Sequence, residues 1–356
     1  MTASILHAYG IHTDSLIEPL TSGLINRTWK VTDGSNQFIL QQINVQVFKK
    51  PYALAENIRW IDQYLKEHSP QYLFVSPVPT IYNEDLFHAK DEGYFRLFPF
   101  IKESHTVDVV VTPEQAFEAA YQFGKFTKFL SGFDATKLHI TIPDFHNLTL
   151  RYHQFEEALK KGNPVRIKQS QPLSDAIKKH VTILTEYEKI KKSKNVKQRV
   201  THHDTKISNV LFDDNGKGIC IIDLDTIMPG YFISDVGDMM RTYLSPANEE
   251  EKDFDTINVR EDFFRAIVQG YINAMGMELT DEERGLILYS GLFLTYMQAI
   301  RFLTDYCYND IYYGARYEEH NYVRAGNQLQ LLKMLSEKKE VLQRIVSEES
   351  KRYYAN

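Results

Sequence analysis

The residues best suited to chemistry lie in one short stretch of the chain. His202, Asp204 and Asn209 follow one another in the spacing H-x-D-x-x-x-x-N, and Asp223 ends the apolar run that comes next. A phosphotransferase needs a carboxylate that orients the attacking hydroxyl and accepts its proton. It also needs oxygen ligands that hold magnesium against nucleotide phosphates, and magnesium takes few of its ligands from the protein. We therefore expect phosphoryl transfer here, with Asp204 as the proton acceptor.

Other classes of protein fit part of the same pattern. A metal hydrolase would bind zinc through His202 and His203 together with the aspartates. Adjacent side chains point in opposite directions on an extended chain, so neighbouring histidines rarely share one ion. A nucleotide-binding pseudokinase would lack one of Asp204, Asn209 or Asp223, and all three are present. The simplest alternative is that these polar residues lie at the ends of a hairpin and have no catalytic role.

A hairpin must position these groups. The apolar runs NVLFDD and GICIID flank the turn NGK, a pattern typical of two antiparallel strands joined by a tight turn. This hairpin would bring Asp223, at the end of its second strand, beside the loop that carries Asp204 and Asn209. We also expect His202 to fix the loop backbone, and Cys220, within ICII, to be a core residue.

The first hundred residues predict a small sheet with one helix. The runs at 15–20, 27–31 and 37–44 are rich in β-branched and aromatic residues, and DGSN (33–36) predicts a turn between the last two. Pro51 fits the first turn of a helix with apolar residues at helical spacing. The run 94–101 predicts a strand that is broken by Pro99.

Beyond residue 111 the pattern is mostly helical. TPEQ (112–115) is a capping box that predicts a helix to about Leu130, and TDEE (280–283) predicts a long helix towards Tyr308. The sequence therefore predicts an α+β, two-lobed fold, with a small sheet-rich nucleotide-binding lobe over 1–100. A large helical lobe over 101–356 would carry the catalytic loop and the acceptor site.

Composition excludes several classes of partner. The 356 residues carry a formal net charge of −6, which gives no basic footprint for nucleic acid. Two cysteines imply no disulfide framework and favour a reducing compartment. The most apolar stretch, 285–300, is interrupted by Ser, Thr and Gln and is too short to span a membrane. With no signal peptide at the N-terminus, we expect a cytoplasmic protein. The sequence does not indicate an oligomeric state.

Longer motifs carry a resemblance to a known family. FILQQIN, RVTHHDTKISNVLFD, IIDLDTIMPG, DVGDMMR, RFLTDY and DIYY resemble the aminoglycoside phosphotransferase and choline kinase superfamily of small-molecule kinases, and within it the N-acetylhexosamine 1-kinases. The similarity runs over nearly the whole chain. It implies a protein-kinase-like fold with ATP as co-substrate in the cleft, Mg²⁺, and phosphate transfer to the anomeric (C1) hydroxyl of GlcNAc or GalNAc.

The resemblance also implies roles for residues of the catalytic loop. Asp204 becomes the catalytic base, and Lys206 would steady the transferred phosphoryl group. Asn209 and Asp223 become magnesium ligands, with Asp225 as a further candidate. Asp235, in DVGD, would accept hydrogen bonds from the catalytic loop and so support it.

The small lobe would bind the nucleotide. The segment TSGLIN (21–26) stands where the resemblance places a phosphate-covering loop, which implies Gly23 and Asn26 as contacts. The usual lysine of the third strand is missing, and Gln41 or Gln42 takes its place; an amide can bind a phosphate but cannot neutralise it. Near Phe98 and Phe100 the chain would cross between lobes and meet adenine. A partner role for Glu56 is accordingly doubtful.

The acceptor site would lie at 296–317. The resemblance implies that Thr226, Arg301 and Tyr312 contact a sugar, whereas we expect Asp305 to form an ion pair with Arg301, four residues earlier on the same helix face. An arginine repels cations, which favours a neutral polyol over choline or an aminoglycoside. Another hexose or homoserine stays open as an alternative acceptor.

Overall fold

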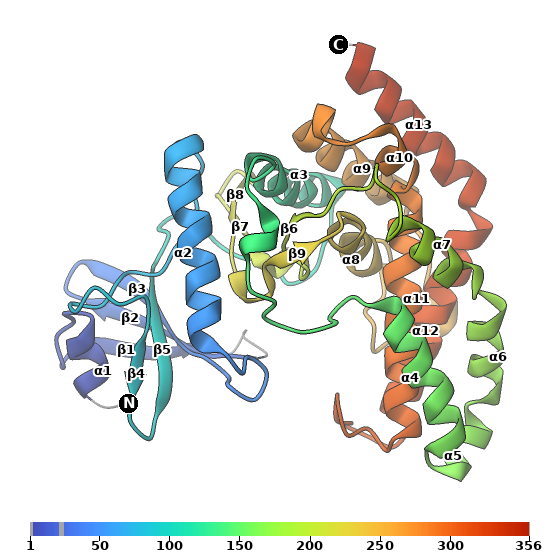
Figure 1. Cartoon of the computed structure of the whole chain (residues 1–356), viewed down its shortest axis with the longest axis horizontal. Coiled ribbons are helices and arrows are strands. Elements are labelled where there is room, and N and C mark those ends of the chain that lie inside the picture. Colours follow the sequence, from blue (N-terminus) through green and yellow to red (C-terminus); the bar gives the residue numbers. More distant parts are fainter. Residues whose placement is uncertain (1–2, 21–24, 356) are drawn as a thin grey trace.

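The computed structural model describes residues 3–20 and 25–355 of the chain (Figure 1). An antiparallel sheet with the short helix α1 (Ala3–Ala8) forms what we call the small lobe. The elements from α3 onward form a large lobe that is mostly helical. Helix α2 (Pro51–His68) lies between the two in Figure 1. The two-lobed α+β fold that the sequence predicted is thus confirmed.

The sheet of the small lobe contains, in the described residues, five strands in the order β1-β2-β3-β5-β4. Their bounds are Leu16–Leu20 (β1), Arg27–Asp33 (β2), Asn36–Gln42 (β3), Phe87–Ala89 (β4) and Gly93–Pro99 (β5). The predicted turn between β2 and β3 is confirmed, with Gly34 at a φ of 60°. Strand β5 ends at Pro99, as expected, because proline cannot donate to a further ladder bond.

The two faces of this sheet differ in character. Val31, Leu40, Phe95 and Leu97 are buried in an apolar cluster with residues of α1. Side chains alternate along a strand, and directly paired residues of neighbouring strands share a face. The opposite face therefore carries the set Thr28, Lys30, Ile39, Gln41, Arg96 and Phe98, in which Gln41 pairs with both Thr28 and Arg96. The polar face of the sheet is the one available to a ligand.

Helix α2 belongs to the core of the large lobe rather than to that of the sheet. Proline at its first turn and apolar residues at helical spacing form it as predicted. Leu54, Ile58, Ile61 and Leu65 all join the larger buried cluster. Asn57, which is buried, donates to the carbonyl oxygens of His139 and Ile227. The helix is thus fixed to the large lobe by both apolar and polar contacts.

The large lobe is built mainly from helices. They are α3 (Pro113–Phe129), α4 (Leu148–Lys161), α5 (Pro164–Gln169), α6 (Gln171–Lys179), α7 (Thr182–Ile190), α8 (Ile233–Tyr243), α9 (Glu261–Met275), α10 (Asp281–Gly285), α11 (Ile287–Cys307), α12 (His320–Glu337) and α13 (Lys339–Ala355). In the described residues, no helix combines the length and the apolar character that crossing a membrane requires.

Both predicted capping boxes are present, but one of the predicted helices is divided. Thr112 and Gln115 cap α3, and Thr280 and Glu283 cap α10 reciprocally. The second box opens only the short α10, because the chain breaks at Leu286 before α11 begins. The prediction of a single long helix from 280 to 308 was therefore wrong at its start, where the first turn and a half forms a separate short helix.

Short strands at the centre of the large lobe hold the predicted hairpin. Strands β7 (Val210–Phe212) and β8 (Gly218–Ile221) are antiparallel, and β6 (Arg199–Thr201) pairs with β9 (Met228–Gly230). The 3-10 turn η2 (Ile207–Asn209) leads into β7, and η3 (Leu224–Thr226) follows Asp223. The hairpin and its position between the predicted polar groups are confirmed.

Candidate active site

Two carboxylates and one ammonium group converge at the ends of the hairpin. Lys206 Nζ lies 3.0 Å from Asp204 Oδ2 and 3.9 Å from Asp223 Oδ2. All three side chains are partly accessible, with 27% of Asp204 and 38% of Asp223 exposed. Burial opposes the charge of Lys206, but the two carboxylates outweigh it and raise the pKa of the ammonium group. The predicted convergence of positions 204 and 223 on one place is thus present.

Asn209 brings an amide group next to the two carboxylates. It is buried at the end of η2, and its Nδ2 donates to the carbonyl oxygen of Asp204 at 2.9 Å. This bond orients the amide, so that Oδ1 stays as an acceptor. The backbone of Asn209 also accepts from Ile222 N at 2.9 Å, which places Asn209 next to Asp223 across the hairpin.

The oxygen donors at this place suit a magnesium ion. Mg²⁺ prefers oxygen ligands and usually takes only one or two carboxylates from the protein. In residues 3–20 and 25–355, no three His, Cys, Asp or Glu side chains are grouped to hold a metal. The candidate donors are instead a mixed set of carboxylate and amide oxygens, from Asp223 and Asn209, beside Asp204.

Asp223 occupies an unusual backbone conformation. Its φ of 61° and ψ of 67° lie in the left-handed region, which Asp tolerates better than most residues. The turn redirects the chain from β8 into η3. Although 38% of its side chain is exposed, partial desolvation, and then the carboxylates of Asp225 and Asp204, raise the pKa of Asp223 to about 7. A cation bound at this carboxylate would favour its ionised form and so reverse that shift.

Two aspartates of helix α8 accept hydrogen bonds from the backbone of the loop that carries Asp204. Asp235 accepts from His202 N at 3.0 Å and His203 N at 2.7 Å, and Asp238 accepts from Thr205 N at 2.8 Å. The predicted role of Asp235 as acceptor for the loop backbone is confirmed. Burial raises the pKa of Asp235 to about 7, although the two N–H bonds act in the opposite direction.

The adjacent histidines face opposite sides of the loop. His202 Nε2 donates to the carbonyl oxygen of Ile222 at 3.1 Å, whereas His203 Nδ1 lies 3.1 Å from the carbonyl oxygens of Thr201 and Thr226 and therefore carries a proton. Burial lowers the pKa of each imidazole to about 4, so both are neutral near pH 7. This arrangement does not place both rings on one ion and so opposes the hydrolase alternative.

Asp225 does not join the donor set in this structure. Its Oδ1 lies 2.5 Å from Arg96 Nη1, and its Oδ2 accepts from Asn26 Nδ2 at 2.6 Å. Both oxygens thus have buried protein partners, and the side chain is 2% exposed. The predicted role of Asp225 as a metal ligand is not supported by this geometry, because a bound ion would have to displace one of these partners.

The predicted nucleotide contacts lie on the polar face of the sheet and at its end. Gly23 lies outside the described residues. Asn26 is buried and accepts from Asn44 N at 3.0 Å while it donates to Asp225. Phe98 stacks beneath the Arg96 guanidinium at 5.0 Å, and Phe100 lies beneath the Lys30 ammonium at 4.5 Å.

Gln41 binds a side chain that the sequence reasoning missed. Its Oε1 accepts from Arg96 Nε at 3.1 Å and from Nη2 at 2.8 Å. Arg96 is a single charge within an apolar strand run, YFRLFP, and that isolation is the signal that could have singled it out. The doubt about Glu56 is supported, since its carboxylate pairs with His139 and Arg59 rather than with the sheet.

On the acceptor side, Arg301 and Tyr312 are brought together. The guanidinium of Arg301 lies over the rings of Phe145, Tyr312 and Tyr313 at 5.6, 5.9 and 5.3 Å. Its Nη1 donates to Gln298 Oε1 at 3.1 Å. Within the described part of the chain Arg301 forms no ion pair, so its charge is not compensated by a carboxylate there.

The expected ion pair between Arg301 and Asp305 is wrong. Asp305 accepts instead from Tyr312 N at 2.8 Å and Tyr313 N at 2.9 Å, and so holds the turn that carries both rings. The buried hydroxyl of Thr226 donates to the carbonyl oxygen of His202 at 2.6 Å. Thr226 thus fixes the loop, and direct contact with a sugar stays a prediction.

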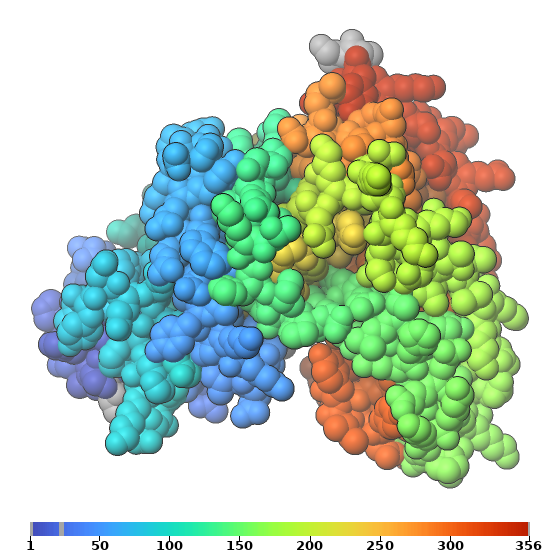
Figure 2. All heavy atoms as spheres, in the orientation of Figure 1, coloured from blue at the N-terminus to red at the C-terminus, as the bar shows by residue number. Residues whose placement is uncertain are grey.

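The segment 139–146, which the sequence analysis did not single out, lines the space between the lobes. A hollow of about 530 Å³ is lined by Lys50, His139, Ile140, Pro143 and Asp144. Thr141 Oγ1 in this segment donates to the carbonyl oxygen of Asp225 at 3.0 Å. Figure 2 shows an open notch between the two lobes along the lower edge of the molecule.

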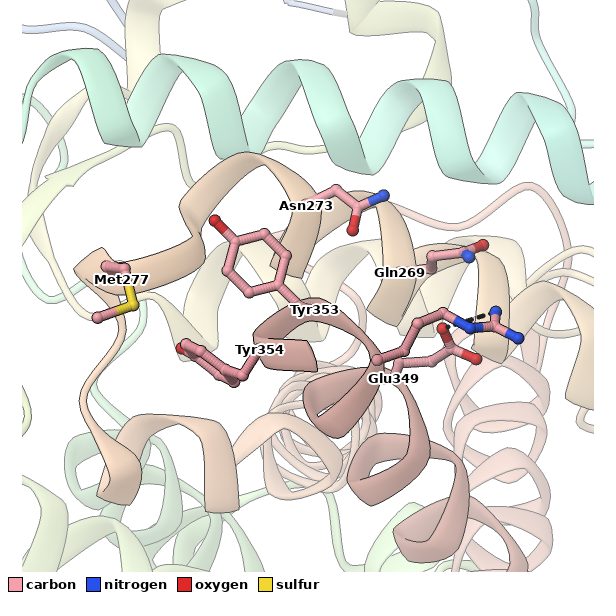
Figure 3. A pocket seen from close by; sticks show the side chains of 7 residues that line it. Gln269, Asn273, Met277, Glu349, Tyr353 and Tyr354 are labelled. Atoms are coloured by element: carbon pink, nitrogen blue, oxygen red, sulfur yellow. Dashed lines mark hydrogen bonds and ion pairs between the residues drawn. The ribbon is translucent and has the colours of Figure 1, made fainter. Parts of the chain in front are cut away.

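A second hollow, of about 570 Å³, lies between α9 and α13 (Figure 3). Tyr353 and Tyr354 line one side of it, and Asn273 and Met277 line the other. Neither helix carries a residue of the candidate site. We therefore assign the site by the convergence of its polar groups rather than by the size of a hollow.

Comparisons with known proteins agree with this architecture. The sequence profile of the phosphotransferase enzyme family matches residues 16–275. A microcompartment-associated aminopropanol kinase has a similar structure, with a TM-score of 0.64, 14% identity and coverage of 96% of this chain and 97% of that one. An aminoglycoside phosphotransferase from Alicyclobacillus acidocaldarius gives a TM-score of 0.59 at 11% identity, with coverage of 100% and 97%. Spectinomycin phosphotransferase, solved with ADP and spectinomycin, gives a TM-score of 0.54 at 14% identity, with coverage of 97% of this chain and 96% of that one. These likenesses show the kinase-like fold of the aminoglycoside phosphotransferase type that the sequence predicted.

Proposed function

The chain belongs to the phosphotransferase enzyme family, and on that premise we propose that it is an ATP- and magnesium-dependent kinase of an N-acetylhexosamine, GlcNAc or GalNAc. The phosphate would go to the anomeric C1 hydroxyl. The observation that carries the proposal is the position of Lys206 Nζ, within 4 Å of both Asp204 and Asp223. One carboxylate for the acceptor and one for the metal thus stand side by side.

Asp204 would act as the catalytic base. Its carboxylate orients the acceptor hydroxyl and takes its proton while that oxygen forms a bond to the γ-phosphorus and the bond to the β–γ bridging oxygen breaks, which releases ADP. Lys206 holds the carboxylate of Asp204 in place and lies where it can offer positive charge to the transferred group. When bound, Mg²⁺ would neutralise charge on the phosphates, and Asn209 and Asp223 would hold it.

The sheet of the small lobe would bind the nucleotide. Its polar face carries Gln41 and Phe98, and the chain passes from that face through Phe100 towards the large lobe. The similar spectinomycin phosphotransferase is a protein solved with ADP, which supports a nucleotide in the corresponding cleft here. Gly23 and Asn26 are proposed contacts of the same nucleotide.

The charge on the acceptor side supports a neutral acceptor. Arg301 forms no ion pair within the described residues, and it stands over the exposed ring of Tyr312. A cationic alcohol placed beside this uncompensated arginine would be repelled, whereas hydroxyl and acetamide oxygens would accept its hydrogen bonds. The alternative is a kinase of another small alcohol, such as another hexose, homoserine, choline or an aminoglycoside.

A panel of acceptors tests the proposal. We would incubate the protein with ATP and Mg²⁺ and with GlcNAc, GalNAc, glucose, homoserine, choline, aminopropanol or kanamycin, and read the phosphate position by ³¹P NMR. We expect the highest kcat/KM for an N-acetylhexosamine, with the phosphate on C1. Faster turnover of choline, aminopropanol or kanamycin would refute the charge argument.

A variant of the metal ligand provides a second test. Asp223→Asn removes one negative charge but keeps the shape of the side chain, so it should weaken ADP binding in the presence of Mg²⁺ and leave ADP binding in EDTA unchanged. Isothermal titration with ADP measures both affinities. An equal loss under the two conditions would contradict a role for Asp223 in holding the metal.

A further inference from the structure

A buried ion pair connects the sheet of the small lobe to the segment that follows Asp223. Arg96 Nη1, from β5, lies 2.5 Å from Asp225 Oδ1, in η3. The side chains are 3% and 2% exposed. Removing one partner of a buried pair leaves the other charge uncompensated, which is why such pairs strongly constrain the elements that carry them.

The register of the sheet explains why the cation stands on β5. Arg96 is paired with Gln41 of β3, and directly paired residues point to the same face. Strand β3 itself (Asn36–Gln42) has no lysine or arginine, although protein kinases carry their phosphate-site lysine on that strand. Gln41 Oε1 accepts two hydrogen bonds from the guanidinium and thereby fixes its plane. The neighbouring strand β5 thus carries a positive charge, that of Arg96, on the face where β3 has none.

Asp225 ties a third segment to the same pair. Its Oδ2 accepts from Asn26 Nδ2 at 2.6 Å, and Asn26 Oδ1 accepts from Asn44 N at 3.0 Å. One carboxylate therefore connects β5, the entrance to β2 and the exit from β3 to the large lobe. Asp225 lies only two residues beyond Asp223, so the position of this pair constrains the turn at Asp223.

We propose that Arg96 is a positioning residue for nucleotide binding: through Asp225 it fixes the segment of Asp223 relative to the sheet, and it supplies the cation that β3 lacks. The inference rests on the proposed nucleotide site. Two of the five guanidinium N–H groups of Arg96 donate to Gln41 Oε1, and Nη1 faces Asp225 Oδ1 as an ion pair without hydrogen-bond geometry, so N–H groups stay available for a ligand. Lys206 pairs with Asp204 and Asp223, and Arg96 pairs with Asp225, so each of these carboxylates has a cationic partner.

The experiment compares Arg96→Met with a matched variant, Arg199→Met. Arg199 pairs with Glu283 at 2.7 Å and is equally buried, but both partners lie in the large lobe. Isothermal titration measures ADP affinity with Mg²⁺ and with EDTA, and the ratio of the two is the gain due to magnesium. We expect Arg96→Met to lower that gain about 10-fold or more, as is typical when a residue that orients a metal ligand is lost. Arg199→Met should lower Tm and leave the gain within twofold of the wild type.

A rescue variant separates positioning from simple support of the fold. Gln41→Lys in the Arg96→Met background returns a cation to the facing position on β3, and it should recover part of the lost gain. Should Arg96→Met fail to fold, Arg96→Lys can be used instead, because it keeps the charge but loses the planar fork. We expect the magnesium-dependent gain in ADP affinity of Arg96→Lys to be lower than that of the wild type and of Arg199→Met, but by less than about 10-fold.

Three results would overturn the inference. They are an unchanged gain in Arg96→Met or Arg96→Lys, an equal loss of gain in Arg199→Met, and no recovery on adding Gln41→Lys. Titration with ADP needs no acceptor, so failure of the wild type to phosphorylate a hexosamine would refute the proposed acceptor alone. A wild type that binds no ADP with Mg²⁺ would refute both proposals.

Discussion

Replacing Asp235 by alanine tests whether helix α8 holds the catalytic loop. The carboxylate accepts from His202 N at 3.0 Å and from His203 N at 2.7 Å. All three residues are buried, with relative exposures of 1%, 0% and 5%. Asp235→Ala leaves both N–H groups without an acceptor in a place that water does not reach. The loop that carries Asp204 should therefore lose both stability and its defined position.

The magnitude follows from these two bonds. A buried N–H that loses its acceptor costs about 1–3 kcal/mol, so two cost about 2–6 kcal/mol. Deleting the carboxylate also removes the cost of burying its charge, a cost that the raised pKa of about 7 reveals. We therefore expect the lower part of the range, about 2–4 kcal/mol, or a fall in Tm of about 3–5 °C for a chain of this length.

Asp213→Ala is the matched control. Asp213 Oδ1 also accepts two backbone N–H bonds, from Asn215 at 2.9 Å and Lys217 at 2.8 Å, but it lies in the exposed turn of the hairpin. Scanning calorimetry gives Tm for both variants, and kcat is measured well below Tm. We expect a much smaller fall in Tm for Asp213→Ala, and a fall in kcat only for Asp235→Ala. Equal changes in Tm would refute the support that we assign to Asp235.

Three further predictions concern the loop and the core. Asp204→Asn should lower kcat about 10²–10⁴-fold and leave ADP affinity with Mg²⁺ within twofold, and near-native turnover would contradict its role as the base. His202 and His203 are held neutral with pKa values of about 4, whereas the unfolded chain takes up these protons from pH 6.5 downward. Each histidine therefore contributes stability that is fully present above pH 6.5 and is lost between pH 6.5 and 4, by up to about 1.4 kcal/mol per pH unit. The raised pKa values of Asp223 and Asp235, about 7, act in the opposite direction over the same range. The histidine contribution is therefore read from the difference in Tm between the wild type and His202→Gln, which should narrow as the pH falls from 6.5 to 4. Gly237→Ala places a Cβ atom 2.3 Å from a carbonyl oxygen of α11 and should cost about 1–3 kcal/mol in urea unfolding, whereas Gly285→Ala, in open space, should cost nothing.

The parts of the site that the sequence predicted depend on local spacing. Asp204 and Asn209 lie in one loop, and a tight hairpin returns the chain to Asp223, so few conformations separate these groups once the hairpin forms. The capping boxes at Thr112 and Thr280 are local in the same sense, since each involves residues three apart. Such features are determined by a few neighbouring residues and can be read without the rest of the fold.

The parts that were missed depend on contacts between distant segments. The pairing of Arg96 with Gln41 spans 55 residues, and only the register of β3 and β5 reveals it. Arg301 and Asp305 stand at a spacing that allows an ion pair, but such a pair contributes only about 0.2–0.5 kcal/mol. The backbone N–H groups of Tyr312 and Tyr313 form two hydrogen bonds with the carboxylate of Asp305, which stabilise it more than the ion pair would. The side chain therefore points to these N–H groups. Tertiary hydrogen bonds thus overrode a weak local preference.

The membership of α2 in the larger core bears on how the protein can be divided. A cut at residue 100 would leave Leu54, Ile58, Ile61 and Leu65 without the residues that cover them. An excised fragment 1–100 would therefore expose a row of apolar side chains to water and aggregate. The same anchoring means that hydrogen exchange in α2 should follow the slow amides of the large lobe rather than those of the sheet. Any opening of the cleft would then move the sheet relative to α2 and the large lobe, and it would have to separate Arg96 from Asp225.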